Sequence, residues 1–150
     1  MAPPKPQGGI ISKIVTKGGV KFHNAVYRLS GGRIAGHMMG GPILLLTTMG
    51  RKSGQPRMLP LLYLGVDEGY VIVASYAGSD KHPAWFLNIE ADANVELQVG
   101  ADKFSATAEI VDDEQRALLW PKLVDMYGDY AVYQARSARK IPVVLIRRNG

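Results

Sequence analysis

Short runs of apolar and β-favouring residues, separated by turn-forming segments, constrain the fold of this chain more than any other feature of its sequence. Runs of this length and composition are typical of strands. Two of the connections, residues 50–54 and 67–69, have a hairpin-turn composition, and short turns between successive strands favour antiparallel pairing. The sequence predicts strands over residues 43–48, 58–64, 70–76, 95–99, 103–111 and 142–146.

Helices are predicted between these strands. Residues 83–90 predict a short helix, with Ser79 or Asp80 as the candidate capping residue. Asp112 and Gln115 have the spacing of a capping box at the start of a second, amphipathic helix.

Further helical signals lie at the two ends of the chain. Pro121 would kink the second helix, and Asp129 can begin another short helix after Gly128. Apolar residues at helical spacing between Ile10 and Leu29 predict an N-terminal helix. Because strands and helices do not alternate as βαβ units, the expected fold is an α+β protein with a small antiparallel barrel and short flanking helices.

Charge is distributed unevenly along the chain. Residues 1–66 hold nine Lys or Arg and no acidic residue, a charge of +9, whereas residues 67–150 hold nine basic and thirteen acidic residues, a charge of −4. This asymmetry predicts an anionic partner for the first half.

Several classes of protein are excluded by what the sequence lacks. A chain without cysteine has no thiol nucleophile and no Cys-based zinc site. His23, His37 and His82 are not spaced as metal ligands, so no metal site is expected. The glycines and lysine of residues 50–54 lack the Walker A order, which argues against an NTPase. Without a long apolar run or a signal peptide, a cytoplasmic location is expected.

The chain divides into two parts after a glycine-rich segment. Residues 1–41 combine a basic lead, an amphipathic helical segment and a loop with glycines and two methionines, whereas residues 42–150 hold the predicted barrel. A basic amphipathic helix either docks on its own domain or makes a weak contact with an anionic membrane. Both alternatives stay open at the level of sequence.

The turn between the first two strands is a candidate anion site. Residues 47–57 gather three cations, three hydroxyls and two glycines; the polar candidates are Arg51, Lys52, Ser53 and Arg57. Glycine lets backbone N–H groups turn toward an anion, while Arg and Lys supply charge. A solvated hairpin tip has a similar composition, so this segment alone does not decide between the two.

Two other segments have the chemistry of a ligand site. Residues 75–88 follow a strand, offer hydroxyls, Gly78 and Lys81, and open a helix whose N-terminus can face an anion. Tyr127, Tyr130 and Tyr133 are spaced to bring their phenols to one side, where they would line either an aromatic pocket or a packed rim.

The ordered motifs together resemble the deazaflavin-dependent nitroreductase family. They are Thr47-Thr48-x-Gly50-Arg51-Lys52-Ser53-Gly54-x-Pro56-Arg57, Pro60-Leu61, Ala77-Gly78-x-x-Lys81-x-Pro83-x-Trp85-x-x-Asn88, and Met126-Tyr127 with Tyr130 and Tyr133. The resemblance implies a split antiparallel β-barrel, related to flavin reductases and FMN-binding proteins. It also implies coenzyme F420, a deazaflavin of actinobacteria whose tail carries a phosphate and an oligoglutamate chain.

The resemblance also implies roles for individual residues. The phosphate and the acidic tail would be bound by Arg51, Lys52, Ser53, Arg57 and Lys81. The deazaflavin would be lined by Ser75, Ala77, Gly78, Pro60 and Leu61, with Trp85 supporting the pocket wall. The substrate would face Tyr127, Tyr130 and Tyr133, and the catalytic candidates are Ser75, Tyr130 and Tyr133.

The implied reaction is hydride transfer to a small electron-poor acceptor. Quinones, nitroaromatics and enones or unsaturated lactones are the acceptor classes, although Leu62 stands where nitroimidazole-activating members have an aromatic residue. Two alternatives remain, a split barrel that binds FMN or a heme-like ligand and a non-enzymatic module that binds anionic lipid. Nucleic acid is not expected, because the cations are not interleaved with stacking aromatics. A dimer is allowed but not required.

Overall fold

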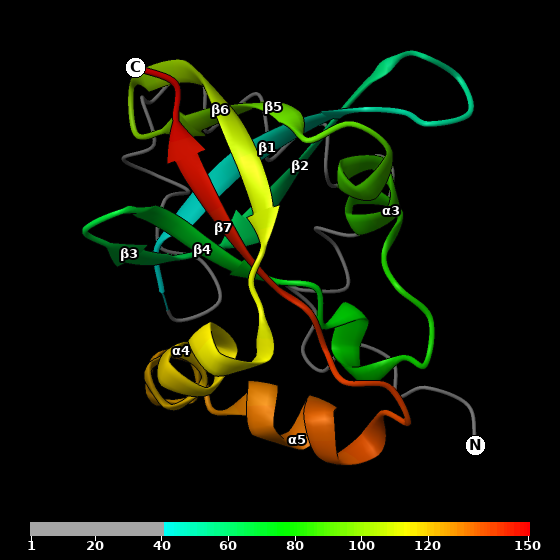
Figure 1. The fold of residues 1–150 in the computed structure, drawn as a ribbon, viewed down its shortest axis with the longest axis vertical. Helices are drawn as coiled ribbons and strands as arrows, with labels where there is room; N and C mark the ends of the chain where they lie inside the picture. Colours follow the sequence, from blue (N-terminus) through cyan, green and yellow to red (C-terminus); the bar gives the residue numbers. More distant parts are fainter. Residues whose placement is uncertain (1–40) are drawn as a thin grey trace.

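A computed structural model describes residues 41–150 of the chain (Figure 1). The predicted N-terminal helix and most of the glycine and methionine loop lie outside the described residues. The strands are β1 (Ile43–Met49), β2 (Pro56–Leu62), β3 (Leu64–Val66), β4 (Gly69–Val73), β5 (Asn94–Val99), β6 (Asp102–Ile110) and β7 (Val143–Arg148). The helices are the short 3-10 turn η2 (Tyr76–Gly78), α3 (Ala84–Ala91), α4 (Asp113–Met126) and α5 (Asp129–Arg136).

All strands belong to one antiparallel sheet, with the order β2-β1-β5-β6-β7-β4-β3. The two edge strands, β2 and β3, are separated in the chain by Tyr63 alone. Because one residue spans less than 4 Å, the two edges adjoin and the sheet must curl on itself. The expected α+β class with a curled antiparallel sheet is confirmed.

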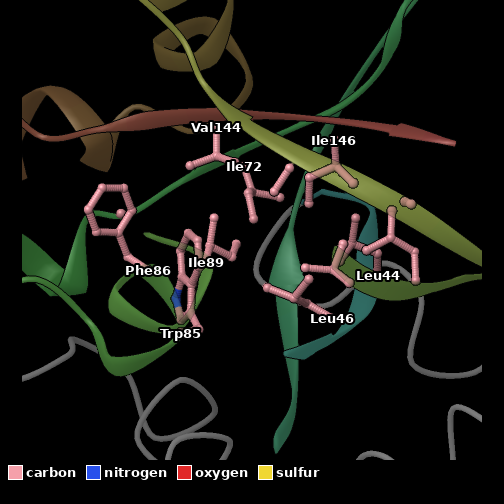
Figure 2. Close-up of a cluster of buried hydrophobic side chains, with 13 residues drawn as sticks. Leu44, Leu46, Ile72, Trp85, Phe86, Ile89, Val144 and Ile146 are labelled. Carbon is pink, nitrogen blue, oxygen red and sulfur yellow. The ribbon is translucent and has the colours of Figure 1, made fainter. Parts of the chain in front are cut away.

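Strands β1 and β7 have successive buried residues that face both sides of the sheet, which explains their unbroken apolar runs. On one face, Trp85, Phe86 and Ile89 of α3 point toward strand residues, as Figure 2 shows; we call this the α3 cluster, whose strand members include Leu44, Leu46, Ile72, Val144 and Ile146. On the other face α4 and α5 pack together against the sheet, forming the α4–α5 cluster; its members include Val71, Val73, Leu119, Leu123, Tyr130, Tyr133, Val143 and Leu145.

Two of the predicted strands have other bounds than expected. The run 58–64 is divided at Tyr63: β2 begins at Pro56 and ends at Leu62, the N–H of Tyr63 donates to the carbonyl of Pro42 at 3.1 Å, and Leu64 begins β3. The run 70–76 ends at Val73, because Tyr76 and Ala77 adopt positive φ angles of 44° and 54° that no strand contains.

The predicted helix ends are partly correct. The side chain of Asp112 accepts a hydrogen bond from the backbone N–H of Gln115 at 2.8 Å, which confirms the cap of α4. The prediction that Ser79 or Asp80 caps α3 is wrong, because the residue at the N-cap is Pro83 and no side chain accepts a capping hydrogen bond there. Helix α4 continues through Pro121 to Met126. None of the helices described between residues 41 and 150 is long and apolar enough to cross a bilayer.

Candidate functional site

The loop between β1 and β2 and the first two residues of β2, together residues 50–57, form an ordered basic turn, which we call the basic loop. Gly50 donates its N–H to the carbonyl of Gln55, and Gly54 donates to the carbonyl of Gly50, both at 2.8 Å. The hydroxyl of Ser53 accepts from the backbone N–H of Gln55 at 3.1 Å and from Nη2 of Arg57 at 3.2 Å. Four of the five residues predicted to bind the anionic tail are exposed on this turn: Arg51, Lys52, Ser53 and Arg57.

Asn88 of α3 fastens the basic loop to the body of the protein. Its Oδ1 accepts from the backbone N–H of Arg51 at 3.1 Å and from Nη1 of Arg51 at 3.4 Å. Its Nδ2 donates to Oγ1 of Thr48 at 3.1 Å, and both Asn88 and Thr48 are buried. Asn88 was part of the sequence motif but had no predicted role, and the structure makes it the anchor of the loop.

We expect Asn88→Ala to lower the free energy of unfolding by about 1–3 kcal/mol, the cost of leaving buried hydrogen-bonding groups without their partner. Urea denaturation measures this loss. Asn94→Ala is the control, because Asn94 is exposed and its side chain bonds to Asp92, its near neighbour in sequence. Equal losses in the two variants would contradict the anchoring role of Asn88.

The connection between β4 and α3 brings the predicted ring-binding residues to α5. Tyr76 and Ala77 have positive φ, and Gly78 follows with a φ of 84°. Gly78 is buried, and a Cβ atom there would lie 3.0 Å from the carbonyl oxygen of Tyr133. Gly78 is therefore held directly beside Tyr133, a predicted substrate residue.

The three predicted tyrosines do come together. The ring of Tyr127 lies 5.0 Å from that of Tyr130 and 6.3 Å from that of Tyr133, measured between centroids. The hydroxyls of Tyr127 and Tyr133 are 3.3 Å apart, within hydrogen-bond distance. Tyr130 and Tyr133 are buried, and Tyr127 is partly buried. All three tyrosines pack in the α4–α5 cluster, and two of them, Tyr127 and Tyr133, are also joined through their hydroxyls.

Burial is the main cause that raises the pKa of Tyr127 and of Tyr130 above the ordinary value of 10.0, and Tyr133 adds to both shifts. We therefore expect both phenols to keep their protons up to about pH 10. A spectroscopic titration of tyrosinate checks this: Tyr127→Phe should leave the curve unchanged below that pH. Because the unfolded chain loses these protons first, the free energy of unfolding should fall as pH rises above about 10. A tyrosinate signal near neutral pH that vanishes in Tyr127→Phe would contradict the shift.

The remaining predicted residues lie around α3. Trp85 is buried in the α3 cluster, where its ring meets that of Phe86 edge to face at 6.3 Å. Pro60 is buried on β2 and Leu61 is partly buried against the α3 cluster, while Lys81 is exposed before the start of α3. Helix α3 thus links the basic loop to the connection between β4 and α3. Residues 75–82 lead into its first turn, and Asn88 contacts the basic loop.

A residue with no sequence signal completes this region. Arg139, in the segment between α5 and β7, donates to the carbonyl oxygens of Ser79, Ala74 and Ser75 at 2.9, 2.9 and 3.0 Å. These contacts span sixty or more positions of the chain. No local pattern around Arg139 marks it, and only knowledge of the tertiary structure could have found it.

A cavity of about 550 Å³ lies apart from these residues, beside β1, β2, β5 and β6. Its lining includes Thr47, Met58, Glu96, Gln98 and Lys103, and it contains none of the predicted site residues. This cavity is therefore separate from the candidate site.

Comparison with known proteins assigns the chain to a family. The sequence profile of the F420H2-dependent quinone reductases matches residues 20–148. The chain belongs to this family. A member from Mycobacterium tuberculosis, named F420H2-dependent quinone reductase, is 40% identical over 134 residues, which cover 86% of this chain and 89% of that protein.

Solved structures agree with this F420H2-dependent family and with its split-barrel fold. An F420H2-dependent reductase is 38% identical, with a TM-score of 0.65, over 71% of this chain and 94% of that one. A protein described as a domain-swapped dimer is 34% identical, with a TM-score of 0.68, over 85% of this chain and 95% of that one. The chain is thus an F420-dependent oxidoreductase with a split β-barrel.

The residues present fit coenzyme F420, the cofactor of this family. A tail with a phosphate and carboxylates requires cations, and the basic loop exposes Arg51, Lys52 and Arg57 on one turn. Near the connection from β4 to α3, Nδ1 of His82 and Nη1 of Arg139 are buried and have no hydrogen-bond partner among the described residues. The basic loop thus supplies the cations that an acidic cofactor needs, and two buried polar atoms near that connection are left without a partner among the described residues.

Proposed function

We propose that this protein reduces a quinone with F420H2 as the hydride donor. The observation that carries the proposal is the match of residues 20–148 to the quinone reductase family. The contact of Gly78 with Tyr133 supports it, because it brings the predicted ring-binding segment against the predicted substrate residues. Proximity of this kind is the main contribution that a protein makes to hydride transfer.

In this proposal the basic loop binds the anionic tail of the coenzyme. Arg51 and Arg57 offer forked N–H donors, and Lys52 adds a compact charge. Asn88 and Ser53 hold the backbone and the Arg57 side chain in place before binding, which reduces the entropy lost when the ligand arrives. The cations are thus preorganised for phosphate or carboxylate.

The tyrosines provide the acceptor side of the site. When bound, reduced F420 supplies a hydride to an electron-poor acceptor. Reduction of a quinone to a hydroquinone takes up a hydride and a proton. Tyr130 and Tyr133 are the candidates for donating a hydrogen bond to the acceptor oxygen, with Tyr127 joined to Tyr133. The high pKa of Tyr127 and of Tyr130, caused mainly by burial, keeps these phenols protonated as donors.

A quinone is the preferred acceptor, and enones and nitroaromatics are the alternatives. Leu62 is buried in the α4–α5 cluster, whereas Tyr63 packs with the α3 cluster on the other face of the sheet. The aromatic ring of Tyr63 is therefore not on the same face as Leu62, which supports the expectation that nitroimidazoles are poor substrates.

The test is a screen of coenzyme oxidation with a quinone, an enone and a nitroaromatic, each at matched concentration. The proposal predicts the highest kcat/KM for the quinone. A parallel fluorescence titration compares oxidised F420 with FMN. Tight FMN binding without F420 binding would overturn the assignment of the coenzyme, while a preference for the enone would overturn only the acceptor.

Two properties of the whole chain are proposed from sequence and relatives. Residues 1–41 are expected to make weak contact with anionic lipid through their basic residues, which co-sedimentation of the full chain with anionic and neutral vesicles tests. A dimer is proposed from the relative described as domain-swapped, and sedimentation velocity tests it.

A further inference from the structure

Arg139 binds the connection between β4 and α3 at three points. Its Nε donates to the carbonyl of Ser79, and its Nη2 donates to the carbonyls of Ala74 and Ser75. These acceptors lie on both sides of η2, the turn that contains Tyr76, Ala77 and Gly78. A single guanidinium therefore ties together the beginning and the end of the predicted ring-binding turn.

Neighbours of Arg139 hold the same turn from the same side. The hydroxyl of Ser137 donates to the carbonyl of Ser79 at 3.2 Å, and the backbone N–H of Ala138 donates to the carboxylate of Asp80 at 2.7 Å. Residues 137–139 thus form a clamp on the connection from β4 to α3. The clamp follows directly on α5, the helix that carries Tyr130 and Tyr133.

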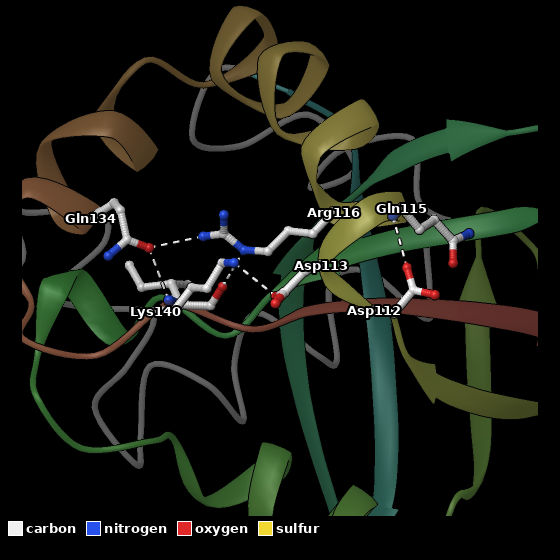
Figure 3. Close-up of polar contacts among 7 residues, drawn as sticks. Asp112, Asp113, Gln115, Arg116, Gln134 and Lys140 are labelled. Carbon is white, nitrogen blue, oxygen red and sulfur yellow. Dashed lines mark hydrogen bonds and ion pairs between the residues drawn. The ribbon is translucent and has the colours of Figure 1, made fainter.

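The clamp is itself fixed to two helices. Gln134 of α5 donates from Nε2 to the carbonyl of Arg139 at 2.8 Å, while its Oε1 accepts from Nη2 of Arg116 and from the N–H of Ile141. Figure 3 shows Arg116 reaching from α4 to Gln134. The backbone of Arg139 is therefore held by a chain of contacts that runs through α4, α5 and the segment before β7.

The turn that Arg139 holds needs such support. Tyr76 and Ala77 are non-glycine residues with φ of 44° and 54°, a conformation that costs free energy and persists only where the surroundings impose it. The hydrogen bonds inside the turn are few: Gly78 donates to the carbonyl of Ser75, and Ser79 donates to that of Tyr76. The contacts from residues 137–139 supply the rest.

The geometry points to Arg139 as a positioning residue, which holds the Ser75–Gly78 turn, with its positive φ angles from Tyr76 to Gly78, in register with the tyrosines of α5. This inference rests on the proposed binding of the deazaflavin ring by that turn. Arg139 acts on the coenzyme through the backbone of Ser75 and not as a catalytic group. Its loss should therefore loosen the turn first and weaken coenzyme binding as a result.

The test compares Arg139→Met and Arg139→Lys with the wild-type chain. Hydrogen exchange, followed by mass spectrometry without coenzyme, measures the peptide that covers residues 74–80 and, for reference, the peptides of β1 and β7. Fluorescence titration with oxidised F420 measures affinity without turnover. Arg136→Met is the matched control, because Arg136 is exposed on the last turn of α5.

In Arg139→Met we expect faster exchange confined to residues 74–80 and a dissociation constant for F420 raised about tenfold, which corresponds to about 1.4 kcal/mol. Arg139→Lys should recover part of both effects, because a lysine can still donate to one or two of the carbonyls. Ser137→Ala, a milder change in the same clamp, should shift the exchange in the same direction and keeps the test valid if Arg139→Met does not fold.

Other outcomes would overturn the inference. Faster exchange throughout the sheet with an unchanged F420 affinity would make Arg139 a general stabilising residue. Unchanged exchange in residues 74–80 would show that the clamp does not hold the turn. If the wild-type chain itself does not bind F420, the proposed function fails, and the exchange data still decide whether Arg139 controls the turn.

Discussion

A Lys52→Glu/Arg57→Glu double variant will bind coenzyme F420 on the order of 100-fold more weakly than the wild-type chain, since each charge-assisted hydrogen bond is worth roughly a factor of ten or more. Both side chains are exposed on the basic loop, so the substitutions create no buried charge. Fluorescence titration of the oxidised coenzyme measures the change without requiring turnover. The remaining affinity should depend less on salt concentration, because fewer ionic contacts are left to screen.

The matched control is a Lys122→Glu/Arg136→Glu double variant. It changes the net charge by the same amount, at exposed positions on α4 and α5 that have no predicted role in the site. If the two double variants lose affinity equally, the coenzyme responds only to the overall field of the protein. If the basic-loop variant keeps its affinity, the phosphate and acidic tail bind elsewhere.

Much of the fold could be predicted because the strands have a strong local signal. The apolar runs of β1 and β7 are buried on both faces of the sheet, so their composition is unmistakable even without alternation. The errors fall where a tertiary contact overrides the local signal. Tyr63 looks like the continuation of a strand, but it is the corner at which the chain passes from one edge of the sheet to the other.

The residues of the candidate site also divide into those predicted from local sequence and those revealed only by tertiary contacts. The basic loop and the three tyrosines were found from sequence, because each group is contiguous or regularly spaced, and the structure shows that the tyrosine rings do meet. Asn88 and Arg139 were not assigned roles. Asn88 reaches the loop across 37 positions, and Arg139 reaches Ala74 across 65. A single sequence contains no information about such pairs.

The backbone between β4 and α3 was the least predictable part. Glycine at position 78 suggested flexibility, but the positive φ of Tyr76 and Ala77 could not be inferred from residue types that normally avoid it. Strained backbone of this kind persists where the surrounding structure imposes it, and it is common at ligand sites. The same turn is the proposed ring-binding segment, so strain and function coincide there.

Gly78→Ala should have the largest effect on stability of the substitutions considered in this region. At a φ of 84° any Cβ atom is strained, and here it would also lie 3.0 Å from the carbonyl oxygen and 3.1 Å from Cα of Tyr133. These are backbone atoms of α5, so they cannot rotate away. We expect a loss of about 2–4 kcal/mol in the free energy of unfolding, measured by urea denaturation, from strain and overpacking together.

Gly54→Ala separates the two causes of that loss. Gly54 also has a positive φ, of 70°, but nothing lies within 4 Å of the position where its Cβ would be. Its substitution should cost only the conformational strain, about 1–2 kcal/mol. The difference between the variants then measures the contact of the turn with α5. Equal losses would mean that the turn moves away from Tyr133 at little cost, and that Gly78 does not fix the ring-binding segment against the tyrosines.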